Sequence, residues 1–100
     1  MTDDLDEIIK AIAHPLRREI LRWLKDPQQS FPEQFHSLEN GVCAGQSEQR
    51  AGRSQSTVSA HLAPLHRAGL ITSQKVGQWH FFKRNEPAIQ AFIQRIGQQL

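Results

Sequence analysis

The stretch from Ser54 to Gly69 constrains the fold more than any other part of this chain, because it carries signals for both ends of one helix. The hydroxyl of Ser54 can accept a hydrogen bond from a backbone N–H in a first helical turn, and glycine is the usual residue just past a helix end. Three apolar residues between them are spaced by four and three: Val58, Leu62 and Leu65. This stripe must face a core, so we expect one helix from Ser54 to Ala68.

The outer face of the first turns of this helix carries no charged residue. Its residues are short and neutral, or small: Gln55, Ser56, Thr57, Ser59 and Ala60. A solvated face usually carries Glu and Lys. A helix that enters the DNA major groove instead needs short donors and acceptors, because acidic groups would repel phosphate and long ones would hold the backbone off the base edges. Gln55 is the best candidate for direct readout of adenine.

A second, shorter helix is predicted just upstream, from Ala44 to Ala51, and Gly52-Arg53 ends it. Two helices joined by a tight glycine turn form a helix-turn-helix, here over residues 44–68. Pro64 predicts a kink in the second of these helices or an earlier end, and we favour the kink.

A hairpin signal follows at once. Two β-prone runs, Leu70–Val76 and Trp79–Arg84, flank Gly77-Gln78, and glycine suits the turn between them. A helix-turn-helix followed by a hairpin over residues 70–84 is a winged helix. The predicted fold class is therefore mainly α with a β-hairpin wing.

Three segments in a fixed order carry a family resemblance: Ala13-His14-Pro15-Leu16-Arg17-Arg18-Glu19-Ile20-Leu21, then Ser59-x-His61-Leu62-x-x-Leu65 with Ala68-Gly69-Leu70, then Gly77-Gln78-Trp79. Together they resemble the ArsR/SmtB family of bacterial winged-helix repressors over roughly Leu5 to Asn85. The resemblance implies a dimer that binds an inverted repeat in duplex DNA, occludes a promoter, and leaves when an inducer binds. The connection from Asp26 to Gly41 looks longer than the family's usual link.

Apolar stripes predict helices at both ends of the chain, over residues 1–25 as two helices and over residues 86–100 as one. The stripe of the first helix is Leu5, Ile8, Ile9 and Ile12, and that of the last is Ile89, Phe92, Ile93, Ile96 and Leu100. The other predicted elements already supply enough apolar side chains to cover the small core. We therefore expect the first and last helices to pair across a two-fold axis, similar to the family's dimer; packing within one chain is the alternative.

The chain has 100 residues and a formal charge of +2, which suits one small domain over residues 1–100. Residues 1–48 hold five Lys or Arg against nine Asp or Glu, or −4, whereas residues 49–100 hold seven against one, or +6. The basic half contains the helix-turn-helix and wing. The predicted DNA-binding residues are Arg50, Arg53, Ser54, Gln55, Ser56, Thr57, Ser59, Ala60, His61, Lys75, Gln78, His80, Lys83 and Arg84.

Other chemistry finds little support. Cys43 is the single cysteine, so neither an intrachain disulfide nor a Cys-x-x-Cys metal site can form, and no pair of histidines has metal-ligand spacing. We expect no metal, no cofactor and no catalysis. Cys43 is interpreted as a half-buried apolar residue, with a redox-sensing thiol as the minority alternative. No segment resembles a membrane span or signal peptide, so the expected compartment is the cytoplasm.

The favoured interpretation is a DNA-binding transcriptional repressor that acts as a homodimer. The inducer, if there is one, fits a small organic molecule better than a metal. Two alternatives stay open: a thiol-responsive regulator that acts through Cys43, and a winged helix that uses the aromatic residues of its wing to bind a protein.

Overall fold

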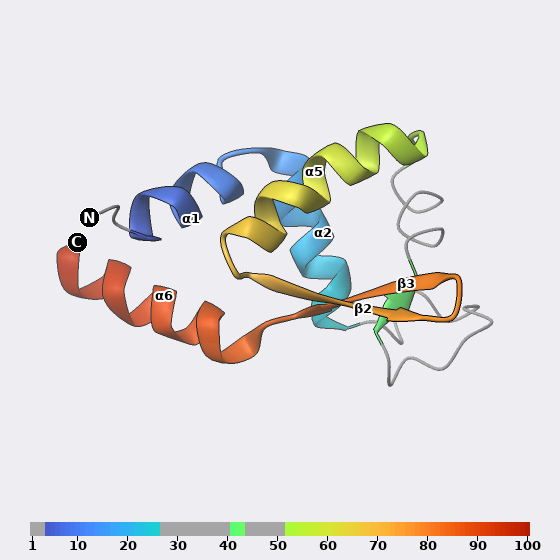
Figure 1. Cartoon of the computed structure of the whole chain (residues 1–100). Helices are drawn as coiled ribbons and strands as arrows, with labels where there is room; N and C mark the ends of the chain where they lie inside the picture. The colour runs from blue at the N-terminus through green and yellow to red at the C-terminus, as the bar shows by residue number, and fades with distance from the viewer. Residues whose placement is uncertain (1–3, 27–40, 44–51) are drawn as a thin grey trace.

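The computed structural model describes residues 4–26, 41–43 and 52–100, drawn in colour in Figure 1. In these ranges it contains four helices and three strands: α1 Asp4–Ile12, α2 Pro15–Lys25, β1 Val42–Cys43, α5 Gln55–Arg67, β2 Ile71–Val76, β3 Trp79–Arg84 and α6 Glu86–Gln99. The helix predicted over Ala44–Ala51 and most of the connection from Asp26 to Gly41 lie outside the described residues.

Helix α5 begins and ends where its sequence signals place it. The Ser54 hydroxyl accepts a hydrogen bond from the Thr57 N–H at 3.3 Å. At the other end Gly69 has φ +78°, the Gly69 N–H donates to the His66 carbonyl, and the Leu70 N–H donates to the Leu65 carbonyl, both at 3.0 Å. This is a Schellman motif, which satisfies two carbonyls that the helix leaves unpaired. Helix α5 continues past Pro64, so the earlier end is excluded.

The core lies where α1, α2 and α5 meet the base of the hairpin. The predicted stripe of α5 is buried, with Val58, Leu62 and Leu65 at most 5% exposed. Helix α2 contributes Ile20 and Leu24 to the same cluster. Its N-cap is His14, whose side chain accepts from the Leu16 N–H at 3.1 Å, and Pro15 takes the first helical position.

The sheet has one strand more than the predicted hairpin. Strand β3 pairs antiparallel with β2 on one side and with the short β1 on the other, giving the order β1-β3-β2. Gly41 leads into β1 with φ +104°, and a Cβ atom there would lie 2.5 Å from the Phe82 carbonyl oxygen. Only glycine fits this close approach. Strand β1 was not predicted from the sequence, because two residues are too short for a strand pattern.

Helix α6 is tied to the end of α5. The Asn85 N–H donates to the Leu70 carbonyl at 2.9 Å, the Asn85 side-chain amide donates to the Gly69 carbonyl at 3.0 Å, and its oxygen caps α6 at the Ala88 N–H. In Figure 1 the start of α5 and the hairpin tip point toward one end of the molecule, and the free ends of α1 and α6 lie at the other. None of the described helices combines the length and apolar character needed to cross a bilayer.

Candidate nucleic-acid interface

The first turns of α5 present short polar groups at the surface. Ser54, Ser56, Ser59 and Ala60 are exposed, and Thr57 is half-buried. The Ser54 hydroxyl lies 3.2 Å from the Ser56 hydroxyl and 3.0 Å from the Thr57 hydroxyl, so it organises the first turn from within. Ser56, Ser59 and Ala60 remain as outward groups, with exposed Arg53 directly before the helix.

The register of the hairpin sorts the predicted wing residues onto two faces. Lys75 pairs with His80, and Ser73 with Phe82, so these side chains share the face that also carries buried Ile71. Lys83 pairs with Thr72 and lies on the opposite face. Lys75, His80 and Lys83 are exposed, as is Gln78 at the turn.

Arg84 lies apart from the other wing residues. Its guanidinium donates to both carboxylate oxygens of Glu86, at 2.6 and 3.3 Å, and to the Leu21 carbonyl at 3.3 Å. Only 13% of its side chain is exposed. The hydrogen bond from Arg84 is the largest cause that lowers the pKa of Glu86 below 4.5. Burial opposes this by raising the pKa, and the positive charges of Arg84 and Lys25 lower it further. Arg84 joins β3 to α6 and α2, so its guanidinium is already engaged by partners within the chain.

His61 connects α5 to α2. Its Nδ1 accepts from the Arg17 Nε at 3.2 Å, and its ring lies 4.4 Å from the His14 ring, centroid to centroid. Burial, followed by the charges of His14, Arg17 and Arg53, lowers the pKa of His61 below 6.5. A neutral imidazole that accepts at Nδ1 carries its proton on Nε2. His61 therefore fixes the orientation of α5 and keeps one donor.

Two residues near the interface were absent from the sequence prediction. The His66 Nε2 lies 3.5 Å from the Ser73 hydroxyl, and both side chains are exposed between α5 and the hairpin. They line a hollow with Ser59. His66 lies about one turn beyond the uncharged face of α5. Ser73 and Lys75 are two positions apart on β2 and so share a face, and this spacing could have predicted Ser73 from the sequence.

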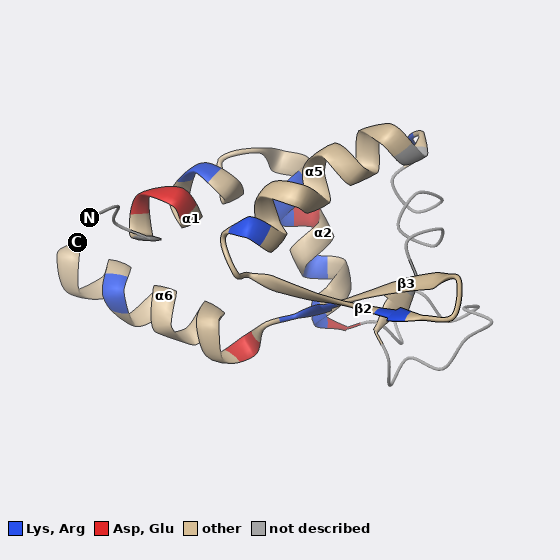
Figure 2. Cartoon of the chain, in the orientation of Figure 1, with Lys and Arg blue, Asp and Glu red and all other residues tan. Residues whose placement is uncertain are grey.

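Charge is unevenly distributed over the described elements. Figure 2 shows no acidic residue on α5 or on the hairpin, whereas α1, α2 and the start of α6 carry acidic groups. Arg50 lies outside the described residues, and so does the side chain of Gln55. Cys43 in β1 pairs through its backbone with Phe81 in β3, and the Cys43 side chain also lies outside the description. Within the described ranges no three His, Cys, Asp or Glu side chains gather as metal ligands; the absence of a metal site stays a prediction.

The apolar stripes at the chain ends divide between core and surface. Leu5, Ile8 and Ile89 are at most 9% exposed and belong to the interior, and Ile12 and Phe92 pack against the core. Ile96 is half-buried. Ile9, Ile93 and Leu100 are exposed by 39%, 50% and 98%. Part of each stripe thus serves packing within the chain, and part faces outward.

Known proteins resemble this chain over most of its length. The HTH-type transcriptional regulator YbzH of Bacillus subtilis is 39% identical over 85 residues, which is 83% of this chain and 85% of the relative. A Halobacterium salinarum protein that carries the name arsenical resistance operon repressor ArsR2 is 33% identical over 86% of this chain and 62% of its own length. The transcriptional activator HlyU of Vibrio cholerae is 31% identical over 87% of this chain and 68% of the relative.

The chain belongs to the ArsR/SmtB family of winged-helix transcriptional regulators. Solved structures agree: HlyU superposes with a TM-score of 0.67 at 28% identity, covering 96% of this chain and 90% of HlyU. A homodimeric winged helix-turn-helix DNA-binding domain from Mycobacterium bovis superposes with a TM-score of 0.68 at 20% identity, over 97% of this chain and 81% of that domain. These family structures confirm the predicted winged-helix fold. No protein-family model matches the chain.

Proposed function

We propose that this ArsR-family regulator binds an inverted-repeat operator as a homodimer, inserts the first turns of α5 into the major groove, and lays its wing along the adjacent backbone. The observation that carries this proposal is the exposed face of α5, where Ser56, Ser59 and Ala60 stand without any acidic neighbour on the helix. Short donors and acceptors at the start of a recognition helix are what base readout requires.

Each exposed group has a role in this arrangement. Ser56 and Ser59 meet base edges or nearby phosphates, and Ala60 allows close approach to a thymine methyl. Gln55, at the first position of α5, is the proposed reader of adenine. Phosphate contacts come from Arg53 before the helix and, on the hairpin face shared with Ser73, from Lys75 and His80, with Gln78 at the turn.

The two-fold partner packs on the outward residues of α1 and α6. Ile9 on α1, Ile93 on α6 and Leu100 directly after α6 are exposed apolar side chains, and burying them between copies is favourable. The homodimeric state of the Mycobacterium bovis domain supports this assembly. Two recognition helices related by such an axis read the two halves of an inverted repeat.

Within this function the direction of regulation is repression, as in the family that the sequence resembles. The relatives carry names of both kinds, a repressor and an activator. An inducer acts by favouring a form of the dimer in which the two recognition helices are wrongly spaced for the operator.

A charge placed on α5 tests the proposal. Ser56→Glu puts a carboxylate in the first turn of α5, where the helix dipole favours it, so the fold is expected to keep or gain stability. The same carboxylate would face phosphate, and we expect binding to the protein's own promoter fragment to weaken at least about tenfold. Gln90→Glu, an exposed position on α6, makes the matched charge change. Equal promoter affinity of the two variants, measured by fluorescence anisotropy, would contradict the proposal.

A further inference from the structure

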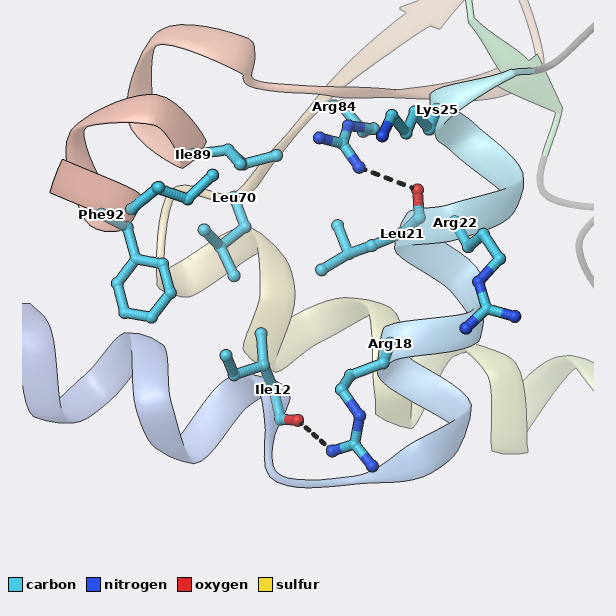
Figure 3. A pocket seen from close by; sticks show the side chains of 10 residues that line it. Ile12, Arg18, Leu21, Arg22, Lys25, Leu70, Arg84, Ile89 and Phe92 are labelled. Atoms are coloured by element: carbon cyan, nitrogen blue, oxygen red, sulfur yellow. Dashed lines mark hydrogen bonds between the residues drawn. The ribbon is translucent and has the colours of Figure 1, made fainter. Parts of the chain in front are cut away.

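A pocket of about 320 Å³ opens between α2, α6 and the base of the hairpin, away from the proposed DNA-binding face. Its floor is apolar and is formed by Ile12, Leu21, Leu70, Ile89, Phe92 and Ile93. In Figure 3 the labelled side chains among these converge on one space from the end of α1, from α2, from α6 and from the turn after α5. The volume is at the lower end of the range for small-molecule sites.

Four basic residues and no acidic one complete the lining among the described residues: Arg18, Arg22, Lys25 and Arg84. Figure 3 places Lys25 and Arg84 together at one edge and Arg18 near Ile12 at the other. Arg84 is occupied by Glu86 and the Leu21 carbonyl, and Arg18 donates to the Ile12 carbonyl at 2.6 Å. The negative charge of Glu86 is thus committed to Arg84, which leaves the rim with an excess of positive charge.

Arg22 and Lys25 are the cations available to a ligand. Arg22 pairs with Glu19 at 3.0 Å, but 73% of the Arg22 side chain is exposed, and such surface pairs hold a side chain only weakly. The Lys25 ammonium makes no hydrogen bond or ion pair with the described residues, and it lies close enough to lower the pKa of Glu86. The two residues lie one turn apart on α2 and both line the pocket; in Figure 3 Lys25 extends toward Arg84, whereas Arg22 extends away from the apolar side chains.

We propose that this pocket binds a small organic monoanion with an apolar tail or ring, with the tail on the apolar floor and the acid group at the α2 rim, against Lys25 and with Arg22 one turn away. The apolar and the basic residues together define the ligand. An inorganic anion would leave the apolar floor uncovered, and an uncharged apolar molecule would leave the excess positive charge of the rim uncompensated. A metal cation is disfavoured by the four positive charges.

The pocket also touches the elements that set the dimer geometry. Arg84, the last residue of β3, contacts Glu86 in the first turn of α6 and the Leu21 carbonyl of α2. A ligand against Leu21 and Ile89 would therefore contact both helices that Arg84 connects. Ile93 lines the pocket and is also one of the exposed residues in the proposed dimer surface. A ligand here acts as the inducer by shifting α6 against α2; this part of the inference rests on the proposed function.

Calorimetric titration of the purified full chain, without DNA, tests the binding site. The probes are sodium octanoate, 1-octanol as the uncharged analogue, and octylammonium chloride as the cationic one. Octanoate is expected to bind saturably, one per protomer, with a Kd of about 1 mM or tighter. Octanol should bind about tenfold more weakly, and octylammonium should not bind. Absence of saturable octanoate binding, or equal affinity for octanol, would overturn the proposal.

Variants separate the head-group and tail contacts. The double variant Arg22→Gln with Lys25→Gln should weaken octanoate binding at least about tenfold, whereas Lys10→Gln, an exposed position outside the pocket lining, should leave it unchanged. Leu21→Phe should fill the floor and abolish binding without a change of charge. Circular dichroism checks that each variant is folded. Equal octanoate affinity of the double variant and Lys10→Gln would contradict the assigned rim.

Promoter binding with and without octanoate then tests the inducer role. Octanoate should weaken promoter binding by the wild type and not by Leu21→Phe. If octanoate binds in the calorimeter but promoter affinity is unchanged, the inducer role is wrong. If the protein binds no promoter DNA under any condition, the proposed function fails, while the calorimetric result still decides the site by itself.

Discussion

At the scale of single residues, His61 shows how a side chain on the recognition helix can serve orientation. Its Nδ1 accepts from Arg17 on α2, and burial with nearby positive charge lowers its pKa below 6.5. Between this lowered pKa and 6.5 the unfolded chain binds more protons at this site than the folded protein. The stability that His61 contributes is therefore fully present above about pH 6.5 and is lost as the pH falls through the folded pKa.

His61→Gln removes this titration and tests its sign. Urea unfolding between pH 7.5 and 5 should show that the wild type loses more unfolding free energy than the variant over this interval. The comparison cancels the other histidines, which both proteins retain. If the two curves stay parallel, the imidazole titrates alike in the folded and unfolded chain, and folding does not lower its pKa.

At the scale of elements, β1 depends on Gly41. Gly41→Ala would place a Cβ atom 2.5 Å from the Phe82 carbonyl oxygen at a φ of +104°, and we expect a loss of roughly 2 kcal/mol or more in unfolding free energy. Gly97→Ala is the matched control, because a Cβ there meets nothing within 4 Å inside α6, and alanine should stabilise the helix by about 0.5 to 1 kcal/mol. Changes of the same sign in denaturant unfolding would contradict this account.

The hairpin register makes a prediction about its two exposed lysines. Lys75 shares a face with His80 and Ser73, whereas Lys83 lies on the other face. Lys75→Gln should lower the slope of log affinity against log salt by about 1 for each phosphate that the side chain neutralises, uniformly over DNA sequences, and Lys83→Gln should change it less. Equal slopes for the two variants would mean that the face toward Ser73 is not the one that meets the backbone.

How far the sequence could predict these elements depended on whether their signals are local. Ser54 and Gly69 bracket α5 because capping uses groups within a few residues, and the structure confirms both ends. Strand β1 is two residues long and is specified by its distant partner β3. The hydrogen bonds of Arg84 to Glu86 and to the Leu21 carbonyl could not be predicted from the sequence. Arginine suits a phosphate contact equally well, and only the fold places the Leu21 carbonyl beside it.

At the scale of the whole molecule, the open question is which residues join two copies. The last helix was predicted to use its full stripe, but Ile89 is buried within the chain and Ile93 is half exposed. Ile93→Glu should shift the protein toward monomer in analytical ultracentrifugation and weaken promoter binding, because two half-sites are held only by a dimer. Gln94→Glu makes an acidic substitution at the adjacent exposed position and should stay dimeric. A dimer that survives Ile93→Glu with unchanged strength would place the interface elsewhere.

Binding of the purified protein to its own upstream promoter fragment and to a scrambled duplex, across a salt series, tests the central claim most directly. A specific regulator should prefer the promoter by roughly 10³-fold or more, and its affinity should fall steeply as salt rises, because the basic groups around α5 and the hairpin displace counterions from phosphate. Equal, weak binding to both duplexes would contradict the claim that the exposed face of α5 reads DNA sequence.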